Sequence, residues 1–315
     1  MNDEKQSCDA GDASLEEQDV NTKQVVQQWI PMDRHLFQTY RHLHLAAIQK
    51  LDNLFTSANI PYWICGGTLL GAIRHAGFIP HDDDLDIECL QQDLVRIANL
   101  SVDTSFLGLA DGGQWQGFPV KKLNFRGDVS IDVFPRVNTW THVDEEKEES
   151  ESNGRVTESV ERKYFPSLVD EVFPLRPYRF ENIQVWGPSC PDAYLKRLYD
   201  EDCFENVLVY NHDYNCFHCN SHHPRRTVLK LNSYNQMFQN SGIHPPIADM
   251  TAEETYRRAF SNFEGGEQEF VNQMKRYRHE RALRWNRADA EYRYEQEELK
   301  VKEKEKMAAT NSEYY

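Results

Sequence analysis

The chain has 315 residues, a formal net charge of −16 and seven cysteines. This length fits one sizeable domain with extensions or two small domains, and the acidic balance argues against a nucleic-acid backbone as partner. No apolar run approaches the roughly 20 residues that a membrane span needs, and the polar first residues are typical of neither a secretory signal nor a mitochondrial presequence. The odd cysteine count forms no disulfide framework, so we expect a reducing, cytoplasmic location.

The first regular element is expected near residue 33. Residues 1–28 lack apolar periodicity, and we expect them to be disordered. From Asp33 to Leu54, apolar residues recur three or four apart, which is the spacing of one helical face. Asp33 is suited to cap this helix, and Asn59 to end it.

A glycine pair then separates a short strand from a helix. Tyr62–Cys65 is aromatic and β-branched, which indicates a buried strand. Gly66 and Gly67 let the backbone turn sharply and approach a ligand, because no Cβ stands in the way. Thr68 follows as a hydroxyl donor or helix cap, and Leu69–His75 is expected to be a helix. The first amides of that helix would suit phosphate oxygens.

A run of aspartates with the spacing D-D-D-x-D follows this helix. We expect a strand here, in which Asp84 and Asp86 share one face while Leu85 and Ile87 point into the core. Two adjacent carboxylates repel each other unless a cation lies between them, and hard oxygen ligands suit Mg²⁺ or Mn²⁺. The alternative is an acidic loop with solvated charges. The glycine pair on the preceding turn favours the metal site.

A third carboxylate lies in a later apolar run. Asp132 stands between Ile131 and Val133, and a charged residue in a strand built for burial needs a partner. That partner could be Arg136 or Arg126, which would make the aspartate structural. The alternative, which we favour, is a third metal ligand brought beside Asp84 and Asp86 by a neighbouring strand. The three residues are then both the catalytic set and the metal ligands.

Three basic side chains are candidates for phosphate binding. Arg74 closes the helix after the glycine pair, and Lys121 and Lys122 lie on the strand before Asp132. Arginine suits bidentate phosphate binding and lysine acts as a point charge, but only one of two adjacent strand residues can face the site. An ordinary surface charge is the alternative for each. The predicted nucleotide and phosphate set is Gly66, Gly67, Thr68, Arg74 and Lys122.

The stretch GGTLLGAIRHAGFIPHDDDLDI, residues 66–87, resembles the signature of the LicD/fukutin family of nucleotidyltransferase-fold proteins. IDVFP resembles the second motif of that family, and PDAYLKRLY resembles a later part of its domain. The resemblance covers about residues 35–210. His81 stands where the family usually has tryptophan, and Asp200 where a glycine usually follows "LY".

The resemblance implies an activity. Family members include bacterial phosphocholine transferases and fukutin-related ribitol-phosphate transferases. The implied donor is a CDP-linked alcohol, and the implied acceptor is a hydroxyl of a glycan or glycolipid. Two alternatives stay open: a nucleotidyltransferase that moves an NMP group from a nucleoside triphosphate, and a non-catalytic binding protein. Fukutin-like members are anchored in the secretory pathway, which keeps an association with that pathway open.

Cysteines and histidines gather after residue 202. Cys216-x-x-Cys219 has the spacing of half a zinc knuckle, and Cys203 with His222 or His223 could complete a four-ligand zinc site. Free thiols and surface histidines are the plainer alternative.

The expected fold is an α/β domain of α+β type. A small mixed sheet flanked by helices would span residues 33–240, with a flexible acidic insertion over 141–161. A hairpin is expected over Phe173–Trp186 and a short helix over Pro191–Tyr199. Residues 250–307 are expected to form a charged helical extension that opens with a capping box at Thr251 and Glu254, followed by a tail over 308–315.

Overall fold

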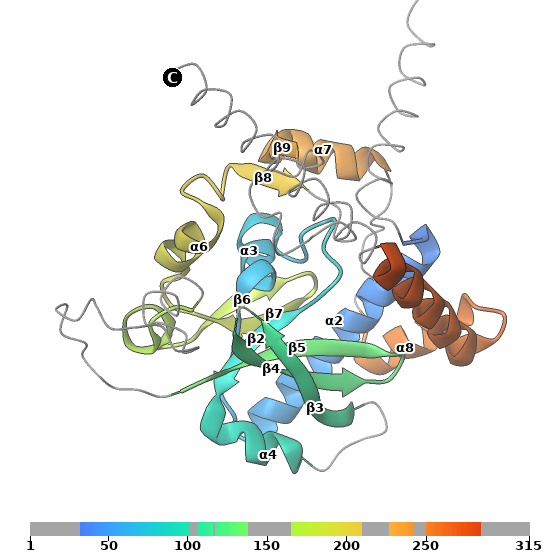
Figure 1. The fold of residues 1–315 in the computed structure, drawn as a ribbon, viewed down its shortest axis with the longest axis horizontal. Helices are drawn as coiled ribbons and strands as arrows, with labels where there is room; N and C mark the ends of the chain where they lie inside the picture. The colour runs from blue at the N-terminus through green and yellow to red at the C-terminus, as the bar shows by residue number, and fades with distance from the viewer. Residues whose placement is uncertain are drawn as a thin grey trace, which may run out of the picture.

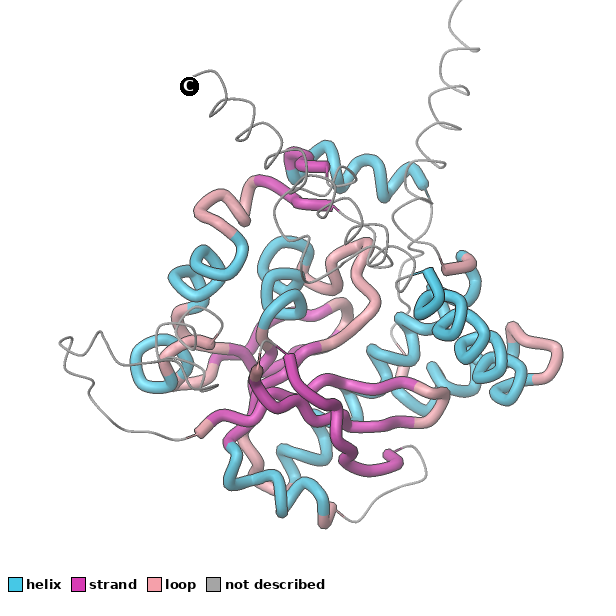
Figure 2. The backbone as a smooth tube through the Cα atoms, in the orientation of Figure 1, coloured by secondary structure: helices cyan, strands magenta, loops and turns pink. Residues whose placement is uncertain are grey.

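The computed structural model describes residues 32–100, 106–115, 117–137, 165–209, 227–241 and 250–284. At its centre lies a five-stranded mixed sheet in the order β1-β2-β5-β4-β3, in which β2 and β5 are parallel and the other neighbouring strands are antiparallel (Figure 1). Its strands are β1 Tyr62–Ile64, β2 Asp86–Leu90, β3 Phe106–Trp115, β4 Phe118–Phe125 and β5 Val129–Arg136. Helices surround these strands (Figure 2), so the predicted α/β class with a small mixed sheet is confirmed.

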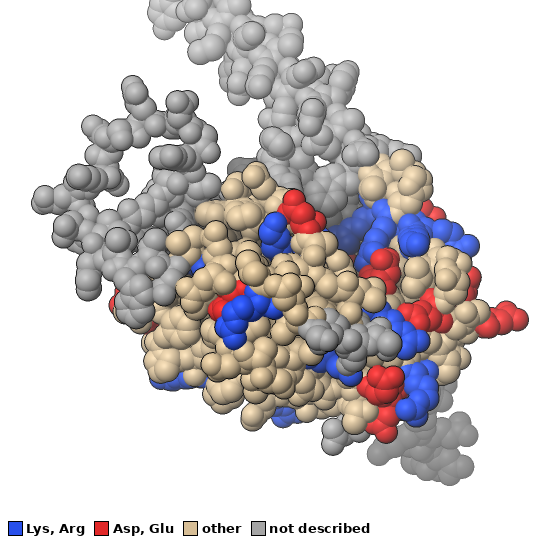
Figure 3. Space-filling view, turned by 90° about the horizontal axis from the view of Figure 1, so that it is seen from below, with Lys and Arg blue, Asp and Glu red and all other residues tan. Residues whose placement is uncertain are grey.

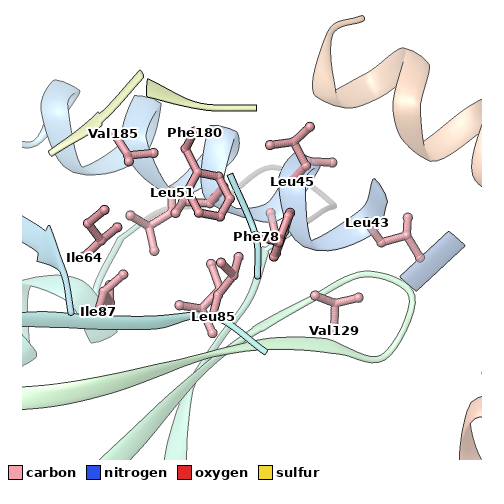
Figure 4. Close-up of a cluster of buried hydrophobic side chains, with 14 of the residues drawn as sticks. Leu43, Leu45, Leu51, Ile64, Phe78, Leu85, Ile87, Val129, Phe180 and Val185 are labelled. Atoms are coloured by element: carbon pink, nitrogen blue, oxygen red, sulfur yellow. The ribbon is translucent and has the colours of Figure 1, made fainter. Parts of the chain in front are cut away.

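One long helix covers one face of the sheet. This helix, α2 Arg34–Ser57, begins where predicted, because the Asp33 side chain accepts hydrogen bonds from the backbone N–H groups of His35 and Leu36. The apolar face of α2 packs against every second residue of the strands, including Ile87 and Val129 (Figure 4). In β2 and β5, every second side chain therefore points to α2, and the intervening side chains point to the opposite face.

The unit around the glycine pair departs from prediction at two boundaries. Helix α3 Gly66–His75 begins at the glycines themselves, three residues earlier than expected, with Gly66 at φ +51°. Strand β2 begins at Asp86, so Asp84 precedes the strand rather than belonging to it. The reason is that pairing starts at this point: Asp86 is the first residue of β2 with a ladder partner in β5.

The next segment contains one wrong prediction. A 3₁₀ turn, Gln91–Asp93, and a short helix, α4 Leu94–Ala98, follow β2. The local sequence Asp111-Gly112-Gly113 predicts a turn between two strands, but this segment lies inside β3, where the pairing register with β4 shifts between Asp111 and Gly113. A β-bulge absorbs the glycines, which is a common use of glycine in a strand.

The second half of the domain adds a hairpin and a helix. The predicted hairpin is confirmed as β6 Arg176–Phe180 and β7 Ile183–Gly187, with a turn at Glu181-Asn182. A π-helical turn, Leu168–Val172, precedes it, and α6 Pro191–Tyr199 follows with the predicted bounds. Asp200 ends α6 at φ +84°, a backbone region that glycine adopts more readily.

The remaining described elements form two groups. A two-stranded sheet, β8 Asn206–Val209 and β9 Thr227–Lys230, leads into α7 Leu231–Ser241. Helix α8 Ala252–Ser261 begins with the predicted capping box between Thr251 and Glu254. A break at Gly265 separates it from a further helix over 266–284, and both lie beside α2 (orange and red in Figure 1).

Several predictions fall on residues outside the described ranges. These are the disordered segment 1–28, the acidic insertion 141–161, the end of the charged extension, the tail 308–315, and the zinc candidates other than Cys203. Cys203 is described and is a buried free thiol. Within the described ranges, no helix combines the length and apolar character needed to cross a bilayer. Figure 3 shows acidic and basic side chains interspersed on the face seen from below.

Candidate functional site

Two of the predicted metal ligands are neighbours in the sheet. Asp86 on β2 and Asp132 on β5 are Cα partners in the parallel pairing. Their alternate neighbours Ile87 and Val133 are fully buried in the core beneath α2. Both aspartates therefore project from the face of the sheet opposite α2, at the same level.

The structure adds a lysine to this row. Lys122 on β4 is the Cα partner of Asp132, and its ammonium forms an ion pair with the Asp132 carboxylate. The arginine partners considered from sequence are wrong: Arg136 lies beside Glu88 and Arg126 beside Glu267. Asp132 is thus held by the very lysine that was predicted to bind phosphate.

The glycine pair lies directly over the carboxylates. A Cβ added at Gly66 would meet the Asp86 Oδ2 atom at 3.2 Å, and a Cβ at Gly67 would meet the Asp82 Oδ2 atom at 2.9 Å. The Asp86 backbone N–H donates to the Thr68 hydroxyl at 2.8 Å, which ties the strand to the helix. The glycines therefore leave room for the carboxylates, whereas Thr68 fixes the backbone that carries one of them.

The remaining aspartates form a tight group before the strand. One carboxylate oxygen from each of Asp82, Asp83 and Asp84 lies within 4.8 Å of the other two. The pKa of the Asp84 carboxyl is raised well above its ordinary value by desolvation and by the charges of Asp82, Asp86, Asp83 and Asp132. The Asp84 side chain is exposed to solvent, so the neighbouring negative charges raise its pKa more than desolvation does. Negative charge is thus concentrated where solvent can deliver a cation.

Arg74 occupies a different place from the one predicted. Its Nη1 atom donates to the backbone carbonyls of Cys203 at 3.1 Å and Asn206 at 3.2 Å. These bonds attach the C-terminal half of α3 to the start of β8. In this geometry Arg74 anchors a neighbouring segment, so it is not an ordinary surface charge.

Two tyrosines of α6 border the glycine turn, and sequence reasoning missed both. The Gly66 N–H donates to the Tyr194 hydroxyl at 3.3 Å, so this first amide of α3 already has a partner. The Tyr199 hydroxyl lies 3.8 Å from a Cβ added at Gly66 and 3.9 Å from one added at Gly67. The PDAYLKRLY segment carried the signal, because it resembled the family domain.

A buried carboxyl lies behind Asp86 on the same face of β2. Glu88 is fully buried and accepts a hydrogen bond from Trp63 Nε1 at 2.9 Å, with Arg136 Nε at 3.5 Å from the same oxygen. Burial raises the pKa of Glu88 to about 7, against the opposing effects of Arg136 and Trp63. The Glu88 carboxyl therefore links β2 to Trp63 and Arg136 inside the protein and is not accessible to solvent.

Two further features surround the acidic loop. His81, which replaces the tryptophan usual in the family, is buried, with its Nδ1 atom 2.7 Å from the Tyr234 hydroxyl. A cavity of about 530 Å³ lies at the C-terminal end of α3, lined by residues of α2, α3 and α7 that include Arg41 and Phe238. The carboxylates of Asp84, Asp86 and Asp132 do not line this cavity, so it is distinct from the candidate site.

The sequence that carries this site is similar to a known protein domain. Residues 59–190 match the model of the LicD/FKTN/FKRP nucleotidyltransferase domain. The matched segment contains the glycine turn, the aspartates and Asp132. The resemblance to the LicD/fukutin family is therefore confirmed over this segment.

Three curated relatives are similar to parts of the chain. An uncharacterized protein of Rickettsia prowazekii is 34% identical over 155 residues, which is 49% of this chain and 53% of that protein. An uncharacterized protein of Rickettsia typhi is 32% identical over 160 residues, 49% of this chain and 44% of that protein. Lipopolysaccharide cholinephosphotransferase LicD of Haemophilus influenzae is 40% identical over 65 residues, 20% of this chain and 24% of that enzyme. The chain thus spans about half the length of the first two relatives and about a quarter of the third.

Proposed function

We propose that this chain, whose residues 59–190 match a LicD/FKTN/FKRP nucleotidyltransferase domain, is a metal-dependent transferase. It would move a phospho-alcohol group, of the phosphocholine or ribitol-phosphate type, from a CDP-linked donor to a hydroxyl of a glycan or glycolipid. The observation that carries the proposal is the pairing of Asp86 with Asp132 next to a glycine turn that leaves space for the carboxylates of Asp86 and Asp82. The similarity to a cholinephosphotransferase supports the choice of group.

The residues present fit Mg²⁺ or Mn²⁺. Asp84, Asp86 and Asp132 would supply hard oxygen ligands, and burial together with the charges of neighbouring aspartates raises the pKa of Asp84. When bound, such an ion would polarise the donor phosphate and stabilise the charge of the CMP leaving group. The cysteines and histidines after residue 202 are not part of this proposed metal site.

The side chains of the chain itself would position the reactants. Thr68 holds the backbone of Asp86, and Tyr194 holds the first amide of the glycine turn. Lys122, paired with Asp132, lies at the same level of the sheet and could offer a point charge to a phosphate oxygen. In the reaction, the acceptor oxygen would form a bond to the alcohol-bearing phosphorus, and the bond from that phosphorus to the CMP oxygen would break. The hydroxyl proton would leave to solvent or to a carboxylate.

A panel of nucleotides tests this proposal. Thermal unfolding would be measured with CDP-choline, CDP-ribitol and nucleoside triphosphates, each with and without Mg²⁺. A ligand that binds the folded state raises its stability by RT ln(1 + [L]/Kd). We expect Mg²⁺-dependent stabilisation by a CDP-alcohol that exceeds the stabilisation by CTP. Stronger stabilisation by a triphosphate would favour NMP transfer, and no stabilisation by any nucleotide would favour a non-catalytic binding protein.

A further inference from the structure

The helix over 266–284 packs onto the domain through one face, although it lies outside the matched segment 59–190. Phe270 and Met274 on this helix are buried in the main core, and Phe270 contacts Phe260 of α8 with ring centroids 5.9 Å apart. Arg278 and Arg281 follow at intervals of four and three residues, so they continue the same helical face. This face therefore turns two guanidinium groups toward the domain.

Arg278 fixes the position of the helix. Its Nη2 atom donates to the Asp128 carbonyl at 2.8 Å and to the Tyr40 hydroxyl at 3.1 Å, and its Nη1 atom pairs with the Asp128 carboxylate. Asp128 lies in the turn between β4 and β5, and Tyr40 lies on α2. The helix is thus attached both to the sheet and to the helix that covers it.

Arg281, one turn further along, reaches the acidic loop. Its Nη1 atom donates to the Asp83 Oδ2 atom at 2.9 Å, across 198 residues of sequence. The two side chains are 24% and 15% exposed, so water screens this pair less than an ordinary surface pair. One aspartate of the run is therefore neutralised by a residue from the C-terminal extension.

This contact bears on which aspartates are open to a metal ion. Asp82, Asp83 and Asp84 have oxygens within 4.8 Å of one another, so Asp83 without its Arg281 contact would be more available in a second group of ligands beside Asp86 and Asp132. We propose that Arg281 is a positioning residue that withholds Asp83 from the metal and so leaves the ion to Asp84, Asp86 and Asp132. This inference rests on the proposed function, because it concerns the placement of the same ion.

Loss of the Arg281 side chain should have opposite effects on metal affinity and on turnover. In Arg281→Gln, a cation is removed from the cluster and the Arg281 contact to Asp83 is lost, so Mn²⁺ should bind more tightly by roughly threefold or more. Turnover should nevertheless fall by about 10-fold to 100-fold, the usual effect of losing a residue that orients metal ligands. The variant Arg281→Gln with Asp83→Asn should recover most of the lost turnover, because the competing ligand is removed as well.

The experiment measures Mn²⁺ affinity by electron paramagnetic resonance and turnover of a CDP-alcohol in parallel. The variants are Arg281→Gln, Asp83→Asn, the double variant, and Arg281→Lys, which should keep the pairing. Arg276→Gln is the surface control, because Arg276 is 67% exposed and pairs with Glu269 of its own helix. Arg278→Gln is the docking comparison, which should lower the melting temperature more than Arg281→Gln does, because Arg278 attaches the helix to both Asp128 and Tyr40.

The outcomes distinguish this inference from the proposed function. A wild-type protein that binds no Mn²⁺ would contradict both. Wild-type binding with unchanged affinity and turnover in Arg281→Gln would contradict this inference alone. Loss of turnover that Asp83→Asn does not restore would assign Arg281 to helix docking and would also overturn the inference.

Discussion

Asp86 and Asp132 are direct neighbours across the parallel pairing of β2 and β5, and both project from the face of the sheet that α2 leaves open. Because they come from strands 46 residues apart in sequence, the parallel pairing is what makes them a pair. A site of this kind depends on the register of the sheet, since a shift of one residue would turn either carboxylate into the core.

The first prediction concerns the ligands themselves. We expect Asp84→Asn and Asp86→Asn to abolish turnover while the melting temperature without metal stays the same or rises. Each change removes a negative charge from a crowded group, but an amide is a weaker ligand, and each 1.36 kcal/mol of lost transition-state stabilisation lowers the rate about tenfold. Melting curves with and without Mg²⁺, together with turnover, would check this. Near-normal turnover in either variant would remove the metal site from this segment.

The second prediction concerns the glycine turn. Gly66→Ala should weaken Mg²⁺ binding as well as stability, because its Cβ would meet the Asp86 carboxylate and its φ is +51°. Gly266→Ala is a matched control, since Gly266 has φ +59° and an added Cβ would meet nothing within 4 Å. Backbone strain of about 1 kcal/mol applies to both variants. Equal effects of the two variants on Mg²⁺ binding, measured by calorimetry, would refute the proposed role of the turn.

The third prediction concerns Arg74. The bonds from its Nη1 atom to the carbonyls of Cys203 and Asn206 lead us to expect that Arg74→Gln lowers the melting temperature by several degrees. The donor dissociation constant of the folded protein should change by less than about threefold. A donor affinity that falls tenfold in a variant with a normal melting temperature would instead restore Arg74 to the phosphate site.

The fourth prediction concerns acidification. Burial, with the nearby charges of Arg74 and Arg41, lowers the pKa of His75 to about 3. The ordinary pKa of histidine is about 6.5, so the unfolded chain binds a proton at His75 more readily than the folded protein does. The free energy of unfolding therefore decreases as the pH falls below about 6.5. Between pH 6.5 and 5 this loss amounts to about 1 to 2 kcal/mol. Urea unfolding of His75→Gln should show a flatter pH dependence than the wild-type protein. An unchanged slope would show that His75 does not contribute.

Local sequence patterns were sufficient for much of the fold and part of the site. Asp33 as a helix cap, the β6–β7 hairpin and the bounds of α6 all follow from local rules that the structure satisfies. The start of β2 does not follow from such rules, because pairing with β5, rather than the alternation of Asp84 and Asp86, decides where the strand begins.

Long-range contacts account for what sequence reasoning missed. Arg74 lies near the end of the helix that begins at the glycine turn, yet its Nη1 atom donates to backbone carbonyls more than 120 residues away in the sequence. The contact of Arg281 with Asp83 joins residues 198 apart and carries no local signal. The pairing of Lys122 with Asp132 could have been found, because the hairpin that joins β4 to β5 places them opposite each other.

The most direct measurement is the identity of the nucleotide product. The protein would be incubated with Mg²⁺, an acceptor glycan and, in separate reactions, CDP-choline, CDP-ribitol or CTP, and the products separated by chromatography, with Asp86→Asn as the inactive control. The account predicts metal-dependent release of CMP together with a glycan that has gained the phospho-alcohol, and neither product from the control. Release of pyrophosphate from CTP, with no CMP from either CDP-alcohol, would contradict it.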